Sequence, residues 1–245
     1  MNLINRGRNG VTFTREGRIL IITLDDPPEN KVTHELFLEF NTHRSLLASP
    51  DIDLVIFTGQ GNIFSKGFDL QSIDENISPQ VLGEQLTFMN EMYAFIESLD
   101  KPVLAAMNGH CLGGGLELAL TCHMRLCSDK ARLGLPEVSI GIIPGLGGIH
   151  RLARVVGQSK ALEMITFGDV IPASEALRIN LVNRLLPREG FMSHVMRLAR
   201  TLLMANQNHV REVIRLLRQA EMNNDQQNIR AAVESFVHIF RKQVT

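Results

Sequence analysis

Residues 108–120, NGHCLGGGLELAL, decide the fold of this chain. The apolar run Val103–Met107 before them predicts a short buried strand, because Pro102 ends the preceding helical pattern. Residues 116–122 predict a helix, so three consecutive glycines stand between a strand and a helix. Such a turn leaves backbone N–H groups unpaired at a helix N-terminus, where the dipole adds about half a positive charge. The turn therefore favours an oxyanion, with a flexible glycine turn as the alternative.

A second glycine turn is predicted after another strand. The triple-glycine turn has the layout of a nucleophile elbow, but no serine or cysteine occupies it, so covalent acyl chemistry is not expected. Gly67 lies in residues 64–70 (FSKGFDL), which follow a predicted strand over residues 53–58 (DLVIFT). Parallel α/β folds bind ligands at the carboxyl ends of their strands, so both turns should lie at one edge. One backbone N–H group from each turn would then form an oxyanion hole.

Two glutamates stand out, and the first of them is a candidate for proton transfer. Glu117 is expected on the first turn of the predicted helix among apolar neighbours, which predicts an enclosed carboxyl with a raised proton affinity. Glu137 ends residues 134–137 (GLPE), where Pro136 stiffens its approach. The glycines of residues 144–148 (PGLGG) lack the spacing and the strand–helix context of a dinucleotide fingerprint, so no NAD site is expected.

Strand and helix patterns alternate in the first half of the chain. Strands are predicted over residues 17–24, 53–58 and Val103–Met107, and helices over residues 33–47, capped by Thr33, and 82–99. This order implies a parallel sheet with crossover helices, and therefore an α/β fold.

Beyond residue 190 the chain has only amphipathic helical patterns. They cover residues 191–205, 210–221 and 227–241. The last one has a stripe of large apolar side chains, namely Ile229, Val233, Phe236 and Phe240. Such a stripe must pack on the core of its own chain or on another subunit.

The composition excludes several classes of protein. In the 245 residues, 25 Lys and Arg balance 26 Asp and Glu to a net charge of −1, with no Trp and one Tyr, so neither nucleic acid nor a charged membrane surface is an expected partner. The three cysteines favour a reducing compartment and buried thiols; they lack the spacing of a zinc module, and no metal site is expected. No secretory or membrane-spanning pattern is recognised, which predicts a cytoplasmic protein.

Residues 64–70, 108–120 and 135–152 (LPEVSIGIIPGLGGIHRL) together resemble the crotonase (enoyl-CoA hydratase/isomerase) superfamily. The resemblance covers residues 11–190 and is weaker towards the end. It implies an α/β spiral of ββα units in residues 1–190 and a helical trimerisation region in residues 191–245. It also implies a homotrimer or a dimer of trimers (a hexamer), acyl-CoA thioester substrates, and no cofactor besides the coenzyme A of the substrate.

The resemblance implies roles for single residues. Phe68 and Gly114 match the two backbone donors of the oxyanion hole, and Glu117 and Glu137 match the two glutamates of hydratases. The implied enzyme is a hydro-lyase of fatty acid metabolism, which adds water syn across C2–C3 of an enoyl-CoA. The substrate-binding residues implied beside these groups are Lys66, Gly67, Asp69, Leu70, Gly113 and Pro136.

Departures from the family pattern keep further functions open. His123 stands where Asp is usual, Ile149 and His150 replace Thr-Gln, and Lys66 replaces a common Ala; as a lysine it would either contact a CoA phosphate or stay solvated. An isomerase needs only one proton carrier, most naturally Glu137. The pattern is also compatible with a thioester decarboxylase, a thioester hydrolase and a non-catalytic acyl-CoA-binding or scaffold homologue.

Overall fold

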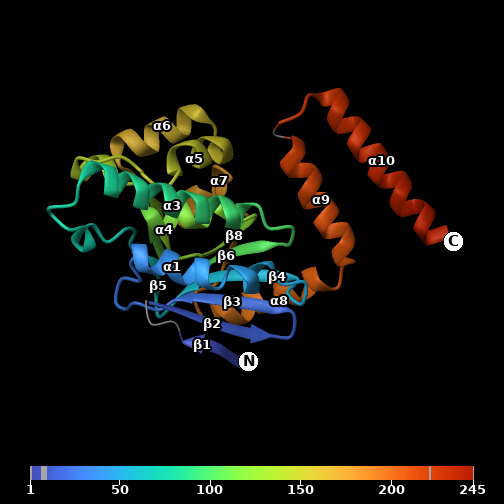
Figure 1. The fold of residues 1–245 in the computed structure, drawn as a ribbon, viewed down its shortest axis with the longest axis horizontal. Coiled ribbons are helices and arrows are strands. Elements are labelled where there is room, and N and C mark those ends of the chain that lie inside the picture. Colours follow the sequence, from blue (N-terminus) through green and yellow to red (C-terminus); the bar gives the residue numbers. More distant parts are fainter. Residues whose placement is uncertain (1, 7–9, 221, 245) are drawn as a thin grey trace.

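A parallel sheet forms the centre of the fold (Figure 1), as the alternating pattern predicts. The computed structural model describes residues 2–6, 10–220 and 222–244. Within these residues a seven-stranded sheet has the order β1-β2-β3-β4-β6-β8-β11, and a four-stranded sheet has the order β10-β9-β7-β5. The strands are β1 (Asn2–Arg6), β2 (Val11–Glu16), β3 (Ile19–Leu24), β4 (Leu54–Gly59), β5 (Ile63–Ser65), β6 (Val103–Met107), β7 (His110–Leu112), β8 (Met124–Ser128), β9 (Arg132–Gly134), β10 (Val170–Pro172) and β11 (Arg184–Leu186).

The central strands β3, β4 and β6 are buried on both faces, so they consist almost entirely of apolar residues. In β3, Leu20 and Ile22 point into the main core, whereas Ile19 and Ile21 pack towards α8. The strands β3, β4, β6, β8 and β11 pair in parallel, and β2 adds an antiparallel hairpin to β3 around Gly17. The sequence analysis did not predict this hairpin, nor the four three-residue strands of the smaller sheet.

The helices cover both faces of the sheets, and Figure 1 shows α3 to α7 on one side. The cap at Thr33 is confirmed, because its hydroxyl accepts from the N–H of Leu36; the predicted single helix breaks at His43 into two. The helices are α1 (His34–Thr42), α2 (Arg44–Ala48), α3 (Pro79–Glu97), α4 (Gly114–Thr121), α5 (Gly148–Val156), α6 (Gln158–Phe167), α7 (Ala173–Arg178), α8 (Phe191–Leu203), α9 (Gln207–Ala220) and α10 (Asp225–Val244), with short 3-10 turns η1 (Leu70–Ser72) and η2 (Glu137–Ile140).

The last two helices, α9 and α10, lie beside the core as an antiparallel pair (Figure 1). The predicted helical ending is confirmed, with bounds shifted by a few residues; Glu221, the predicted end of the middle helix, lies outside the described residues. The apolar stripe of α10 stays exposed, with Phe236 68% and Ile229 65% accessible. A domain boundary at residue 190 stays a prediction. Among the described residues no helix is long and apolar enough to span a membrane.

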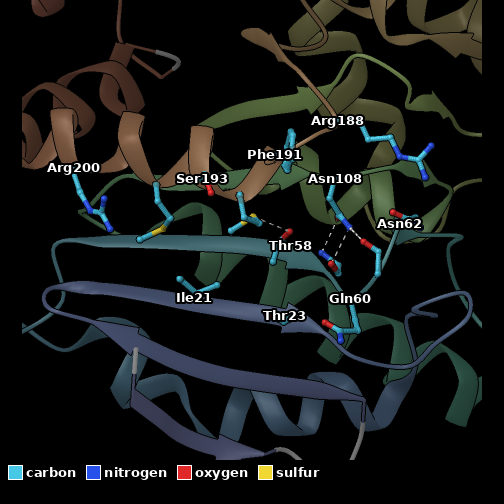
Figure 2. A pocket seen from close by; sticks show the side chains of 14 residues that line it. Ile21, Thr23, Thr58, Gln60, Asn62, Asn108, Arg188, Phe191, Ser193 and Arg200 are labelled. Carbon is cyan, nitrogen blue, oxygen red and sulfur yellow. Dashed lines mark hydrogen bonds between the residues drawn. The ribbon is translucent and has the colours of Figure 1, made fainter.

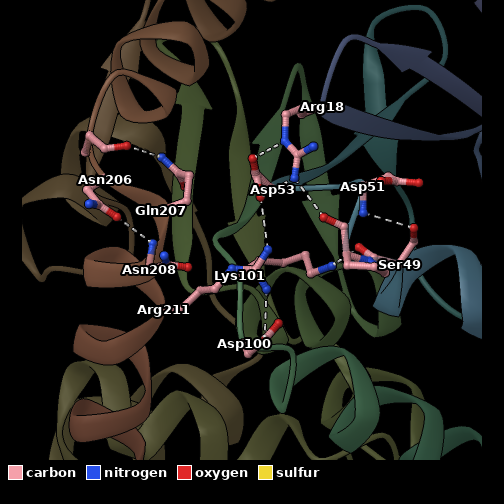
Figure 3. A network of polar contacts seen from close by, with 12 residues as sticks. Arg18, Ser49, Asp51, Asp53, Asp100, Lys101, Asn206, Gln207, Asn208 and Arg211 are labelled. Carbon is pink, nitrogen blue, oxygen red and sulfur yellow. Dashed lines mark hydrogen bonds and ion pairs between the residues drawn. The ribbon is translucent and has the colours of Figure 1, made fainter.

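A network of charged side chains attaches α9 to the core (Figure 3). Arg211 donates to Asp53 at 3.0 Å and to Asp100 at 3.0 Å, and Arg18 also pairs with the carboxylate of Asp53. Lys101, fully buried beside them, donates to the carbonyl of Ser49 at 2.6 Å. The hydrogen bond from Arg18 is the main cause that lowers the pKa of Asp53.

We expect Asp53→Asn to lower the free energy of unfolding by about 1–3 kcal/mol at neutral pH, because it weakens two charged hydrogen bonds at once. Folding lowers the pKa of Asp53. The carboxylate therefore stabilises the folded protein at pH values above its pKa in the unfolded chain, and this stabilisation is lost as the pH falls through its pKa in the folded protein. Urea unfolding across this pH range measures the effect. Asp51→Asn, at an exposed neighbouring position, is the control. An Asp53 variant as stable as the Asp51 variant would contradict the prediction.

Candidate active site

The two predicted glycine turns meet because they follow adjacent parallel strands, β5 and β7. A methyl carbon added to Gly114 would lie 3.2 Å from the nitrogen of Phe68, and one added to Gly67 would lie 3.3 Å from the nitrogen of Gly114. Neither of these two N–H groups donates to an acceptor within the part of the chain that the structure describes. Two unpaired donors, from Phe68 and Gly114, therefore lie close together at the start of α4.

The side chain of Asn108, which follows β6, is hydrogen-bonded to the end of β4 and to the loop after it. Its amide donates to the carbonyls of Gly59 and Gly61, each at 2.9 Å, and its oxygen accepts from the N–H of Gly59 at 3.1 Å (Figure 2). The side chains drawn in Figure 2 line a cavity between β3, β4 and α8. Its volume is about 510 Å³. None of the predicted site residues lines this cavity, so it is separate from the two glycine turns.

Glu117 lies on the first turn of α4 and is only 2% accessible, as its apolar neighbours predict. Its Oε1 accepts from the N–H groups of Leu146 and Gly148, both at 2.8 Å. Burial is the main cause that raises the pKa of Glu117 to about 7, and the charge of Glu137 adds to it; the two N–H groups and Arg151 act in the opposite direction. This carboxyl therefore exchanges its proton near neutral pH.

Glu137 begins η2, and its carboxyl adjoins the triple-glycine turn. A methyl carbon added to Gly113 would lie 3.0 Å from Glu137 Oε1, so the turn needs glycine here as well as for its positive φ of 50°. The other oxygen, Oε2, is buried and has no hydrogen-bond partner among the described residues. Burial raises the pKa of Glu137. These properties suit a carboxyl that exchanges a proton with a bound reactant.

The structure places several more of the predicted residues in the walls of the site. Gly67 has a φ of 106°, and its N–H donates to the hydroxyl of Ser65, which orients the loop. Gly113 caps α4, and Pro136 precedes Glu137 at the start of η2. Leu70, at the start of η1, is 41% exposed.

The charged residues of this loop are paired with two residues that the sequence analysis missed. Lys66 contacts Glu29 at 2.7 Å, and Asp69 contacts Lys31 at 3.0 Å. Residues 29–32 run beside the loop because Val32 forms a parallel bridge with Phe68. The sequence signal is a complementary order of charges: an acid and then a base at positions 29 and 31, and a base and then an acid at positions 66 and 69.

His123, which stands where the family pattern has Asp, accepts a partly buried hydrogen bond. Its Nδ1 accepts from the N–H of Val103 at 3.0 Å, so a neutral histidine supplies an acceptor at the start of β6. Burial lowers the pKa of His123, which keeps the ring neutral. Ile149 and His150 are exposed on α5. Among the described residues no three His, Cys, Asp or Glu side chains form a group that could hold a metal ion.

Residues 14–245 match the sequence profile of the family described as enoyl-CoA hydratase/isomerase. The chain belongs to this family. Its relatives include the Bacillus subtilis (strain 168) protein named "Probable enoyl-CoA hydratase", 38% identical over 182 residues that cover 71% of this chain and 68% of the relative. They also include the crotonyl-CoA hydratase of Syntrophomonas wolfei, 34% identical over 204 residues that cover 82% and 78%.

The family fold is shared over nearly the whole chain. The crystal structure of a Thermobifida fusca YX protein in complex with acetoacetyl-CoA superposes with a TM-score of 0.87 at 28% sequence identity. The match covers 96% of this chain and 96% of that one. The crotonase fold expected from the three motifs is therefore confirmed.

We expect Glu117→Gln to stabilise the protein at alkaline pH relative to the wild type. The pKa of Glu117 rises from 4.5 in the unfolded chain to about 7 in the folded protein, so ionisation of this carboxyl opposes folding. The neutral carboxyl contributes its full stability below pH 4.5, and this contribution is lost as the pH rises through about 7. The glutamine cannot ionise, so its relative stability should increase by up to about 3 kcal/mol between about pH 5 and about pH 8. Urea unfolding at both pH values measures this difference.

The matched control is Glu163→Gln on α6, where the side chain is 49% exposed and pairs with Lys160. Its stability relative to the wild type should change little over the same pH range, because exposed ion pairs are worth little. A Glu117 variant that loses relative stability at alkaline pH would contradict the expected sign.

Proposed function

We propose that the protein is an enoyl-CoA hydratase, which adds water across C2–C3 of a 2-enoyl-CoA thioester and catalyses the reverse reaction. The observation that carries the proposal is the convergence of two unpaired backbone donors with two buried carboxyls of raised pKa. The names of the Bacillus and Syntrophomonas relatives support the same reaction.

The backbone donors take the charge of the intermediate. Attack of water at C3 moves negative charge to the thioester oxygen, and the N–H groups of Phe68 and Gly114 stabilise this enolate. Because the donors are fixed before the reaction, they need no reorganisation as the charge develops. The Phe68 side chain takes no part in the bond and forms part of the pocket wall.

The two glutamates share the proton transfers. One carboxylate removes a proton from the attacking water, and the other carboxyl protonates C2 on the same face, which gives syn addition. Neighbouring carboxyls tend to share one proton, and this supplies one acid and one base near neutral pH. The proton belongs to the pair formed by Glu117 and Glu137 rather than to either residue.

Coenzyme A enters only as part of the substrate in this proposal. General acid–base catalysis with an oxyanion hole completes the hydration without a metal or a redox group. The residues proposed to line the substrate are those of the oxyanion loop, the glycine turn and the residue before Glu137, namely Lys66, Gly67, Asp69, Leu70, Gly113 and Pro136.

The proposal includes self-association in the cytoplasm. The exposed stripe of α10 (Ile229, Val233, Phe236 and Phe240) is too apolar to remain in water, so we propose that the helices after residue 190 form a homotrimer, alone or as a dimer of trimers. The three thiols are buried and unpaired, which fits a reducing compartment.

An enoyl-CoA isomerase is the second candidate. The observation that favours it is the unequal binding of the two carboxyls: Glu117 Oε1 is held by two N–H groups, whereas Glu137 Oε2 has no partner among the described residues. A double-bond shift needs a single proton carrier, and Glu137 alone would serve.

Turnover of crotonyl-CoA, followed by the loss of its conjugated absorbance, tests the proposal. The expected product is 3-hydroxybutyryl-CoA. A panel of 2-enoyl, 3-enoyl and malonyl-type thioesters with product analysis separates hydratase from isomerase, decarboxylase and hydrolase. Thioester binding without turnover of any panel member would overturn the proposal in favour of a non-catalytic homologue.

A further inference from the structure

One face of α3 reaches both halves of the candidate site. Asn90, Tyr93 and Glu97 are spaced by three and four residues, so they lie on the same side of the helix. The amide of Asn90 donates to the carbonyl of Gly145 at 3.0 Å, and the hydroxyl of Tyr93 donates to the carbonyl of Gly114 at 2.9 Å. Both acceptors belong to the turns that hold the catalytic groups.

The contact of Tyr93 fixes the oxyanion turn. Its ring is fully buried, and its hydroxyl reaches the carbonyl of the residue whose N–H is one of the two unpaired donors. A buried hydroxyl and a buried carbonyl each lose water on folding, so this hydrogen bond is held firmly. The bond therefore restrains Gly114 against the body of the protein.

The contact of Glu97 acts through Arg151, which is 4% accessible. Arg151 Nε donates to Glu97 Oε2 at 3.0 Å, and Nη1 donates to the carbonyl of Leu146 at 3.0 Å. A methyl carbon on Gly147 would lie 2.1 Å from Nη1, so glycine at this position leaves room for the guanidinium. Arg151 and Asn90 thus hold two successive carbonyls of the turn whose N–H groups bind Glu117 Oε1.

We propose that α3 is the brace of the active site: Tyr93 positions the oxyanion hole, and Asn90 and the Glu97–Arg151 pair position the cradle of Glu117. These are positioning residues, since none of them touches the reacting atoms. The inference rests on the proposed function, because it assigns these contacts to the hydration reaction.

The brace also sets the charge that Glu117 experiences. The ionisable groups that bear on Glu117 among the described residues are Glu137 from η2, Arg151 from α5 and Tyr93 from α3. Arg151 lowers the pKa of Glu117, and the carboxylate of Glu97 neutralises part of the Arg151 charge. Removing Glu97 and removing Arg151 should therefore move the proton affinity of Glu117 in opposite directions.

The first experiment measures this sign with a ¹³C NMR titration of the glutamate carboxyl carbons in the free protein, where the Glu117 signal is identified by its absence in Glu117→Gln. Glu97→Gln is expected to lower the pKa of Glu117, and Arg151→Met to raise it. A merely structural role would move both in the same direction or neither. Either of those results would overturn the charge assignment. Glu97→Gln keeps the size of the side chain and serves alone if Arg151→Met does not fold.

The matched control is Arg154→Gln. Arg154 donates to the same Glu97 carboxylate at 2.9 Å, but its side chain is 47% exposed, whereas that of Arg151 is 5% exposed. Solvent screens exposed charges, so we expect no change in the titration and activity within about twofold of the wild type. An effect as large as that of Arg151→Met would overturn the specific role of Arg151.

The second experiment tests the oxyanion half with Tyr93→Phe, which removes a single hydroxyl. We expect kcat for crotonyl-CoA to fall about tenfold, the equivalent of one hydrogen bond, while KM changes little. Unchanged kcat in a folded variant would overturn the role of Tyr93. If the wild type hydrates no enoyl-CoA, the proposed function fails, and the NMR titration still decides whether the brace controls Glu117.

Discussion

Glu137→Gln is expected to lower kcat/KM for crotonyl-CoA hydration by about 10²–10⁴-fold, the usual contribution of a positioned acid or base. The substitution keeps the shape of the side chain but removes its ability to take up and release a proton. The unpartnered Oε2 and the raised pKa of Glu137 are the structural reasons to expect so large a loss. Glu117→Gln should cause a loss of similar size, since the pair acts as a unit.

Steady-state rates with crotonyl-CoA, combined with circular dichroism of the folded variants, measure this loss. Glu163→Gln, an exposed glutamate on α6, is the control and should keep full activity. Retention of full activity in both the Glu117 and the Glu137 variants would exclude the hydratase assignment. Loss of hydration in the Glu137 variant alone would contradict the expectation that the two carboxyls act as a unit.

Gly114→Ala is expected to lower the rate of crotonyl-CoA hydration by about 10²–10³-fold while leaving the fold intact. The new methyl carbon would lie 3.2 Å from the nitrogen of Phe68, within the space that the thioester oxygen must occupy. The N–H group remains, but a methyl carbon that keeps the oxygen away from it should have a cost similar to the loss of one oxyanion donor, which is of this order. Gly114 begins α4 and does not need a positive φ, so alanine fits the backbone.

Gly83→Ala is the matched control, because nothing lies within 4 Å of the added methyl carbon on α3. It should stabilise the protein by about 0.5–1 kcal/mol and leave turnover unchanged. Thermal unfolding and the crotonyl-CoA assay of both variants measure these effects. An active Gly114→Ala protein would show that the oxyanion hole lies elsewhere.

The sequence predicted the parts of the site whose chemistry depends on local pattern. Three glycines between a strand and a helix place unpaired N–H groups at the start of that helix. An acid on the first turn of an apolar helix is expected to be buried. The triple-glycine turn and Glu117 could therefore be singled out from their neighbours, whereas the choice of Gly114 within the turn rests on the family resemblance. Gly67 needed the further rule that parallel strands present their carboxyl ends at one edge.

The remaining parts depend on distant contacts that no local pattern specifies. The strands of the smaller sheet have three residues each, too few for an alternation to stand out. The amphipathic pattern of α3 predicts a helix and a buried side, but not that Tyr93 and Glu97 serve two different turns. The cradle of Glu117 consists of backbone N–H groups, which every residue except proline carries, so the sequence holds no sign of it.

Because the two hydrogen-bond donors of the site are backbone N–H groups, side chains around them can be replaced without loss of the donors. Replacing the Phe68 side chain leaves its amide in place, and the isoleucines at 140, 142 and 143 are accessible next to Glu137. We therefore expect substitutions at these positions to change the preference for acyl chains without removing a main-chain donor or a carboxyl. Libraries aimed at new chain lengths should therefore vary these four positions and leave the glycines untouched.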